Sequence, residues 1–167
     1  GPPAGDGRRS RSVYCEAGAG AGGGRGGKIL HCSGDGLLIV FEIGSKEREA
    51  EVCESALDAA IDAFDSLAVV NHRRRHAGQP EIEFGLGLQL GQVTHANVDA
   101  PGRLDFNGVG QDVNMTARIQ SLTKETGEPL LLSGDFAKLV QRPLRRVGEY
   151  NLRGVAGAQE LFTPVEL

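Results

Sequence analysis

Two apolar runs joined by a Gly-Asp-Gly step constrain the fold of this chain most strongly. Residues 28–33 (KILHCS) and 37–42 (LLIVFE) have the length and composition of β-strands, and Asp35 lies in the step between them. Asp-Gly suits the positive φ angles of a type I′ turn, so the segment predicts a β-hairpin. A carboxylate at such a turn can also hold a divalent cation. Asp35 is therefore a candidate turn residue and a candidate metal ligand.

A second strand is expected over residues 81–91 (EIEFGLGLQLG), where apolar and polar or small residues alternate. This period of two is typical of a strand with one buried face. Residues 92–98 (QVTHANV) are a candidate hairpin partner. The apolar face of the strand would carry Ile82, Phe84, Leu86, Leu88 and Leu90.

Two long helices are expected on either side of this strand. Apolar residues recur at helical spacing within residues 46–77, after Ser45 as a candidate cap and before Gly78. A second helix is expected from about Gln111 to Thr126, ending at Gly127. Further strands over 129–133, 144–155 and 158–166, with a short helix over 134–141, complete the pattern. The mixture predicts an α+β fold with a largely antiparallel sheet and flanking helices.

Residues 1–27 differ from the rest of the chain because they hold ten of its 25 glycines and several arginines. We interpret them as a Gly/Arg-rich flexible arm, in which SVYCE could form at most a short strand. The folded domain is expected over residues 28–167.

The charge and composition of the chain limit the classes of partner and the kinds of site that it can have. The net charge is −4, so no overall field favours nucleic acid, and no apolar run is long enough to span a membrane. The three cysteines form no Cys-x-x-Cys pair, which argues against a disulfide framework or a zinc knuckle. A cytoplasmic location is the expectation.

Asn114 and Arg118 are four residues apart in the second helix, so they share one face of it. A solvated helix face is the plain alternative, although Asn is a poor helix former in a helix interior. Together with Asp35, the pair suggests the two halves of a site for a nucleoside triphosphate.

From about Lys28 to Pro164, the chain resembles the catalytic domain of class III adenylate and guanylate cyclases. The resemblance rests on SGDGLLIVF, FGLGLQLGQV, RLDFNGVGQDVNMTARIQSLT, PLLLSGDFA and LRRVGEYNLRGVAGAQELFTP, which occur in the family's order and spacing. It implies a ferredoxin-like sheet and formation of a 3′,5′-cyclic monophosphate and pyrophosphate, from ATP more than from GTP. It also implies Mg²⁺ or Mn²⁺ and sites shared across a homodimer, or a heterodimer with another cyclase domain.

The resemblance assigns a role to each matching residue. Asp35 matches a metal ligand, Asn114 the residue that orients the ribose, and Arg118 the residue that meets charge on the α-phosphate. A planar guanidinium that is always charged suits that task. Arg153 matches a cationic position that holds the terminal phosphates, although pairing with a surface glutamate is an equal alternative.

The sequence also departs from the family in three places. The strand with the first metal aspartate, and the helix after it, are expected to be missing, because residues 1–27 are too short to supply both. His31 stands where adenylate cyclases carry a base-reading Lys, and Asn107 stands where they carry Asp or Thr. His31 and Asn107 remain candidate substrate contacts.

Two other functions stay open at this point. A catalytically degenerate, cyclase-like domain could dimerise and regulate without turnover, as the missing aspartate suggests. A diguanylate cyclase is disfavoured, since no Gly-Gly-Asp/Glu-Glu-Phe run is present. His72 and His76 flank three arginines, so a solvated basic helix end is favoured over a zinc site.

Overall fold

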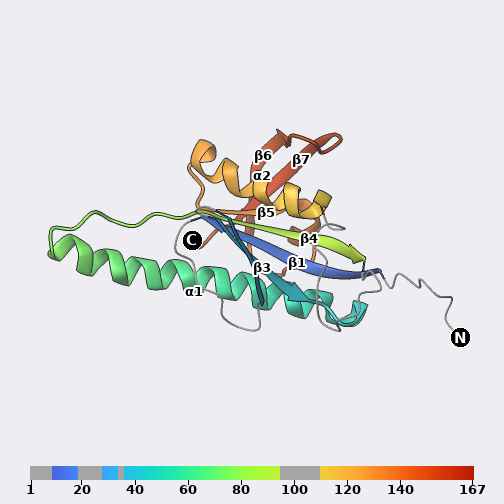
Figure 1. Ribbon diagram of the computed structural model, residues 1–167, viewed down its shortest axis with the longest axis horizontal. Helices are drawn as coiled ribbons and strands as arrows, with labels where there is room; N and C mark the ends of the chain where they lie inside the picture. Colours follow the sequence, from blue (N-terminus) through green and yellow to red (C-terminus); the bar gives the residue numbers. More distant parts are fainter. Residues whose placement is uncertain (1–8, 19–27, 34–35, 95–109) are drawn as a thin grey trace, which may run out of the picture.

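A seven-stranded sheet forms the middle layer of the protein in this computed structural model, which describes residues 9–18, 28–33, 36–94 and 110–167. The strand order in the described residues is β2-β3-β1-β4-β5-β7-β6. Figure 1 shows α1 below this sheet and α2 above it. The strands are β1 (Arg9–Gly18), β2 (Lys28–Ser33), β3 (Gly36–Glu42), β4 (Leu86–Thr94), β5 (Leu130–Ser133), β6 (Leu144–Asn151) and β7 (Ala158–Pro164).

The predicted α+β class with a mainly antiparallel sheet and flanking helices is confirmed. Every pair of neighbouring strands is antiparallel except β4 and β5, which are parallel. The part β2-β3-β1-β4 has the order of a ferredoxin-like sheet. The hairpin is also confirmed, because β2 and β3 are antiparallel and Ser33 pairs with Gly36; residues 34–35 between them lie outside the described residues.

The prediction of a flexible arm over residues 1–27 is wrong for Arg9–Gly18, which form β1. This strand lies in the interior of the sheet, where it pairs with β3 on one side and β4 on the other. Its own apolar pattern is weak, with Val13 and Cys15 as its buried apolar residues. Two strongly strand-forming neighbours satisfy the backbone groups of β1 on both edges, and this tertiary pairing overrides the weak local signal. The central strand that was expected to be missing is therefore present.

The connection from β1 to β2 is short. These strands run parallel to each other on either side of β3, and such crossovers usually take a dozen or more residues, often as a helix. Here the link comprises only residues 19–27. Lys28 and Tyr14 both pair with Val40, so the start of β2 is level with Tyr14. It lies four residues before the end of β1 at Gly18 and two strands away across the sheet. That offset is about 13 Å by 10 Å, within the reach of nine residues. The described residues include no helix between β1 and β2.

Helix α1 (Glu49–His76) follows a single 3₁₀ turn over Lys46–Arg48. Ser45 precedes that turn in an extended conformation but makes no side-chain capping bond, so its predicted capping role is not realised. At the other end, Gly78 adopts a φ of 71°, which suits the left-handed residue after a helix. The predicted basic C-terminus is present as the run Arg73, Arg74, Arg75 and His76.

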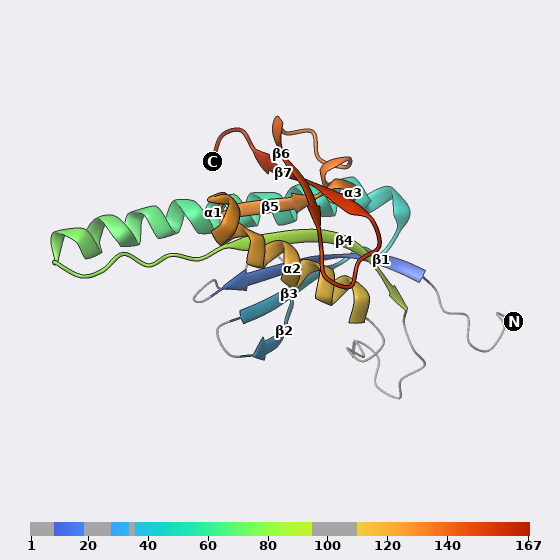
Figure 2. The same ribbon diagram turned by 90° about the horizontal axis from the view of Figure 1, so that it is seen from above.

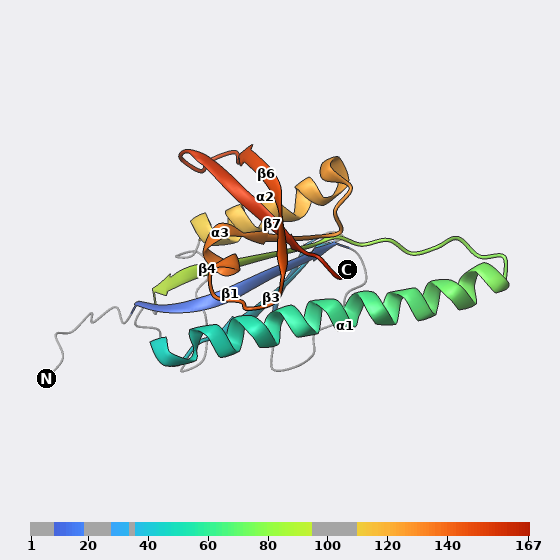
Figure 3. The same ribbon diagram turned by 180° about the vertical axis from the view of Figure 1, so that it is seen from behind.

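The strand predicted over residues 81–91 is confirmed in part, because β4 begins at Leu86 instead of Glu81 and ends at Thr94 instead of Gly91. β4 runs continuously through Gly91 to Thr94, so the candidate hairpin partner over residues 92–98 is wrong for residues 92–94, and residues 95–98 lie outside the described residues. Arg9–Ala17 of β1 pair along the whole length of β4, which explains why the strand continues. Residues 79–85 precede the strand as an irregular return segment beside the end of α1 (Figure 3).

The two faces of the sheet bury two separate apolar clusters. The larger one joins α1 to β1, β3 and β4, with Leu57, Leu88 and Val13 fully buried in it. The smaller one lies beneath α2 (Gly110–Thr126) and reaches β5, β7 and the link between β6 and β7. A one-turn helix, α3 (Gly134–Ala137), follows β5, and the Ser133 side chain accepts a hydrogen bond from the Phe136 amide at 3.2 Å.

Candidate functional site

Helix α2 lies against a row of small residues on β4. A Cβ atom added to Gly87 would lie 2.8 Å from the backbone nitrogen of Gln120, and one added to Gly91 would lie 2.5 Å from the Asp112 carboxyl carbon. Contacts this short leave no room for a side chain. The glycines of β4 therefore set how closely the helix approaches the sheet. Sequence reasoning assigned them to the polar face of the strand and missed this role.

The inner face of α2 is fixed by apolar and small polar side chains. Met115 and Ile119 are buried against Leu131 and Leu161 of the sheet. Thr116 is also fully buried. Because these residues recur at helical spacing, the orientation of the helix about its own axis is determined.

The outer face of α2 carries Asn114 and Arg118, and both are exposed. They lie one turn apart, as the four-residue spacing predicts. An exposed arginine on a well-anchored helix can reach an anionic group without losing a contact that stabilises the fold. The alternative of a solvated helix face predicts the same exposure, so exposure alone does not assign the role.

Arg153 occupies the corner of a tight turn between β6 and β7. The Val155 amide donates to the Leu152 carbonyl at 2.9 Å, and Gly154 has a φ of 84°. A positive φ at the third position of a four-residue turn is typical of a type II turn, which places Arg153 at the second position. Leu152 is buried in the same cluster as Met115 and Ile119. The structure thus brings the turn of Arg153 against α2, the helix that carries Asn114 and Arg118.

The other predicted site residues lie in, or next to, segments that the structure does not describe. Asp35 and Asn107 fall on residues that the structure does not describe. His31 belongs to β2 and pairs with Leu38, next to an irregularity in the pairing after Ile29. Strands β2 and β3, which flank Asp35, lie at one edge of the sheet, whereas α2 covers β1, β4 and β5 (Figure 2). The hairpin and the Asn/Arg helix are therefore on separate parts of the domain.

A carboxylate that sequence reasoning missed lies on β1. Glu16 pairs with Leu38 of β3, and Gly18 pairs with Gly36 at the end of the hairpin. The Cα atoms of Glu16 and Gly36 are thus two residues apart along the strands and one strand apart across them, or about 7 Å by 5 Å. The signal was a lone acidic residue within SVYCE, which becomes informative only once that segment is known to be a strand.

The described residues contain no group of three or more His, Cys, Asp or Glu side chains that could hold a metal ion. Glu16 nevertheless lies on β1, the neighbour of β3, and Asp35 stands in the sequence between β2 and β3. Carboxylate oxygens are the ligands that Mg²⁺ and Mn²⁺ prefer. These two residue types therefore fit the donor chemistry of a hard divalent cation.

No helix in the described part of the chain is both long and apolar enough to cross a lipid bilayer. No protein-family model matches the sequence.

Individual curated proteins do match. An uncharacterized protein of Mycobacterium tuberculosis is 32% identical over 142 residues, which cover 83% of this chain and 24% of that protein. An adenylate cyclase of Anabaena cylindrica is 30% identical over 122 residues, covering 71% of this chain and 23% of that protein. The chain thus spans about a quarter of the length of these relatives.

Solved structures share the fold over nearly the whole chain. The adenylyl cyclase CyaB from P. aeruginosa superposes with a TM-score of 0.75 at 18% identity and covers 96% of each chain. The guanylyl cyclase Cya2 superposes with a TM-score of 0.70 at 20% identity and covers 93% of this chain and 92% of its own. By fold and by sequence similarity, this chain is identified as a domain of the class III adenylate and guanylate cyclase type.

Proposed function

We propose that this domain converts a nucleoside triphosphate, ATP in preference to GTP, into its 3′,5′-cyclic monophosphate and pyrophosphate. The observation that carries the proposal is the grouping of Asn114 and Arg118 on the exposed face of α2, with the turn of Arg153 packed against the same helix. The name of the Anabaena relative, an adenylate cyclase, favours ATP. The proposal applies to the domain, because the relatives extend well beyond it.

In this reaction, the ribose 3′-oxygen attacks the α-phosphorus, the bond to the β-phosphate oxygen breaks, and pyrophosphate leaves. The proton of the 3′-hydroxyl is released to solvent. Arg118 would donate hydrogen bonds to the α-phosphate oxygens as charge grows on them, and this help is largest in the transition state. Asn114 would hold the ribose so that the 3′-oxygen is in line with the leaving group. Arg153 would bind the terminal phosphates.

Glu16 and Asp35 are proposed as the carboxylates that hold Mg²⁺ or Mn²⁺. When bound, the metal supplies positive charge that neutralises the phosphates and favours the alkoxide. Two protein carboxylates with water and phosphate oxygens would complete the ligand set that Mg²⁺ uses at nucleotide sites. Glu16 has the same carboxylate donor as an aspartate, on a side chain that is longer by one methylene.

A dimer is proposed because the two halves of the site lie on separate parts of one domain. The hairpin of Asp35 is at the sheet edge, and α2 lies over strands further in. In a two-fold arrangement, α2 of one copy would face the hairpin of the other, so each site would take residues from both.

The test measures cyclic nucleotide formation from ATP and GTP with Mn²⁺. The chain is assayed alone and mixed with a cyclase domain that keeps both metal aspartates but lacks its own Asn and Arg. We expect the mixture to form cyclic nucleotide, and we expect this product to be lost when the chain carries Arg118→Ala. Lys124→Ala, an exposed cation on the same helix, is the matched control and retains activity. Equal activity of the Arg118→Ala and wild-type chains would overturn the assignment.

A second candidate is a degenerate domain that dimerises and regulates without its own metal site. The short β1–β2 link, residues 19–27, and the glutamate in place of an aspartate on β1 favour it. The same assay separates the two functions. Product from the chain alone supports a complete enzyme, product only in the mixture supports a half-site donor, and no product from the folded chain in either supports a regulatory domain.

A further inference from the structure

The second half of α1 extends beyond the sheet and is covered on one side only. The last fully buried residue of the helix is Ala60, so residues 61–76 include no buried side chain. Those 16 residues span about 24 Å. Figures 1 and 3 show this end of α1 beside the return segment of residues 79–85, and no other described helix or strand runs along it. Phe64 stacks on Phe84 there, at 4.9 Å between ring centroids.

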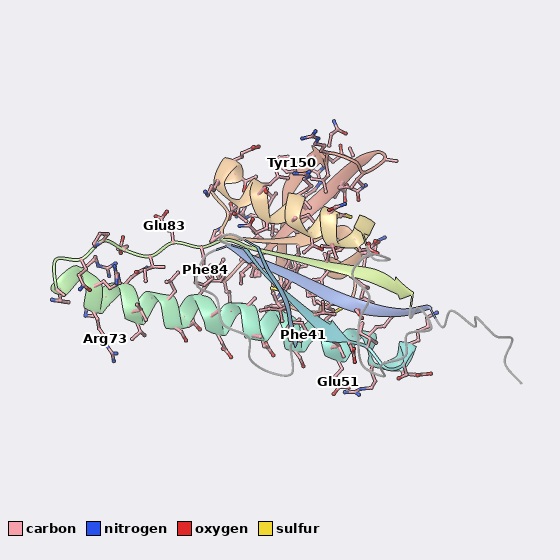
Figure 4. All side chains as sticks on the ribbon, in the orientation of Figure 1. Phe41, Glu51, Arg73, Glu83, Phe84 and Tyr150 are labelled. Carbon is pink, nitrogen blue, oxygen red and sulfur yellow. The ribbon has the colours of Figure 1, made fainter. Side chains whose placement is uncertain are left out.

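The side of α1 that faces away from the return segment carries an ordered stripe of exposed residues. Their spacings of three, four, four and three place them on one face of the helix. We define the α1 stripe as Asp62, Asp65, Val69, Arg73 and His76, all of which are exposed. The stripe begins with acidic residues, has an apolar centre and ends with basic ones. Figure 4 shows Arg73 pointing away from the domain.

The centre of the stripe is unusual for a solvated helix. Val69 is 54% exposed and its neighbour Val70 is 41% exposed. Valine is a poorer helix former than the long polar residues, and exposing it gains nothing in water. The order of the charges also complements the helix dipole, with acids toward the N-terminus and bases toward the C-terminus. The dipole gives no reason for two exposed valines between them.

The stripe is complementary to itself when it is reversed. Asp65 and Arg73 each lie four residues from Val69, and Asp62 and His76 each lie seven residues from it. Two antiparallel copies of the helix with Val69 at the two-fold axis would therefore place Asp65 opposite Arg73 twice. The valines of both copies would form the apolar centre, and the two helix dipoles would run in opposite directions.

We propose that residues 62–76 of α1 form an interface between two antiparallel copies of this chain. The overlap is about 21 Å long and falls within the projecting half of the helix, so the two sheets lie at opposite ends of the pair. This face is distinct from the α2 face, because α1 and α2 cover opposite sides of the sheet. The contact is small, so the association is weak, with a dissociation constant on the order of 0.1 mM.

Charge reversal tests the pairing by sedimentation velocity over a concentration series of the full chain. Asp65→Arg and Arg73→Asp each place like charges opposite one another twice, so each variant alone should associate about tenfold more weakly. An equimolar mixture of the two variants restores both pairs and should form a heterodimer as readily as the wild type. The double variant should also self-associate like the wild type. Glu47→Arg, a reversal of an exposed charge before the helix, is the matched control.

A second measurement locates the two-fold axis. Val69→Cys should form a disulfide-linked dimer under mild oxidation, and Ala50→Cys, an exposed position near the start of the same helix, should not. A mixture of the charge-reversal variants that associates no better than either one alone would overturn the proposal. If neither Asp65→Arg nor Arg73→Asp weakens self-association, the chains associate through another face, and the proposal is overturned as well. Neither measurement depends on cyclase activity.

Discussion

The backbone nitrogen of Gln120 lies so close to Gly87 that a Cβ atom on Gly87 would be 2.8 Å from it. The Thr116 carbonyl oxygen would lie 3.1 Å from this added Cβ atom. Both neighbours are backbone atoms of α2, which cannot rotate away as a side chain could. Gly87 therefore determines how closely the helix that carries Asn114 and Arg118 packs on β4.

Gly87→Ala is expected to lower the free energy of unfolding by about 1–3 kcal/mol, because the extra methyl overpacks the contact between helix and sheet. Urea denaturation measures the loss. Gly44→Ala is the matched control, since a Cβ there meets no atom within 4 Å. Equal denaturation midpoints for the two variants would show that α2 is free to shift. Activity of Gly87→Ala should also fall, because the displaced helix misplaces Arg118.

Asn71 and Ile82 exchange two hydrogen bonds that hold the return segment on α1. The side-chain amide of Asn71 donates from Nδ2 to the Ile82 backbone carbonyl at 2.8 Å, and the backbone amide of Ile82 donates to Asn71 Oδ1 at 2.7 Å. Asn71→Ala is expected to cost about 1–2 kcal/mol locally, since both bonds are lost. Amide hydrogen exchange should accelerate at Ile82 and along residues 79–85.

Asn114→Ala is the matched control for that change. Asn114 is likewise an Asn within a long helix, but it is exposed and its side chain makes no hydrogen bond to another described residue. Alanine is the better helix former, so this variant should be as stable as the wild type or slightly more stable. Equal exchange rates at Ile82 in Asn71→Ala and Asn114→Ala would contradict a role for Asn71 in holding the segment.

Arg153→Ala is expected to raise the KM for the triphosphate about tenfold or more while leaving the domain folded. The guanidinium would lose its contact with the terminal phosphates, and the exposed side chain contributes little to packing. Steady-state kinetics at a fixed Mn²⁺ concentration measure the change. Arg145→Ala removes an exposed cation of β6 that pairs with Glu128 at 2.6 Å, and it should leave KM unchanged. A KM that moves equally in both variants would argue against phosphate binding by Arg153.

Glu16→Gln and Asp35→Asn are each expected to reduce Mn²⁺-dependent activity about tenfold or more, because an amide is a weaker ligand than a carboxylate for a hard cation. Mn²⁺ titration monitored by electron paramagnetic resonance should show weaker binding in both. Glu51→Gln, an exposed acid on α1, serves as the control. Unchanged Mn²⁺ affinity in Glu16→Gln would remove β1 from the metal site and favour the degenerate function.

The sequence determined most elements whose signal is local. The β2–β3 hairpin, the end of α1 before Gly78 and the end of α2 at Gly127 follow from strand runs and from glycines that adopt positive φ. The shared face of Asn114 and Arg118 follows from helical periodicity alone. Such features need only a few neighbouring residues, so they can be inferred without the fold.

Only the tertiary structure decided the role of Arg9–Gly18. Its residues form a strand because β3 and β4 pair with it on both edges, and this pairing is a contact between segments distant in sequence. The same holds for Gly87, for which the close approach of α2 is visible only in three dimensions, and for Arg153, which Leu152 brings beside that helix. Pairing and packing between distant segments add backbone hydrogen bonds and excluded volume that no local pattern encodes, and here they placed the central strand and one side of the candidate site.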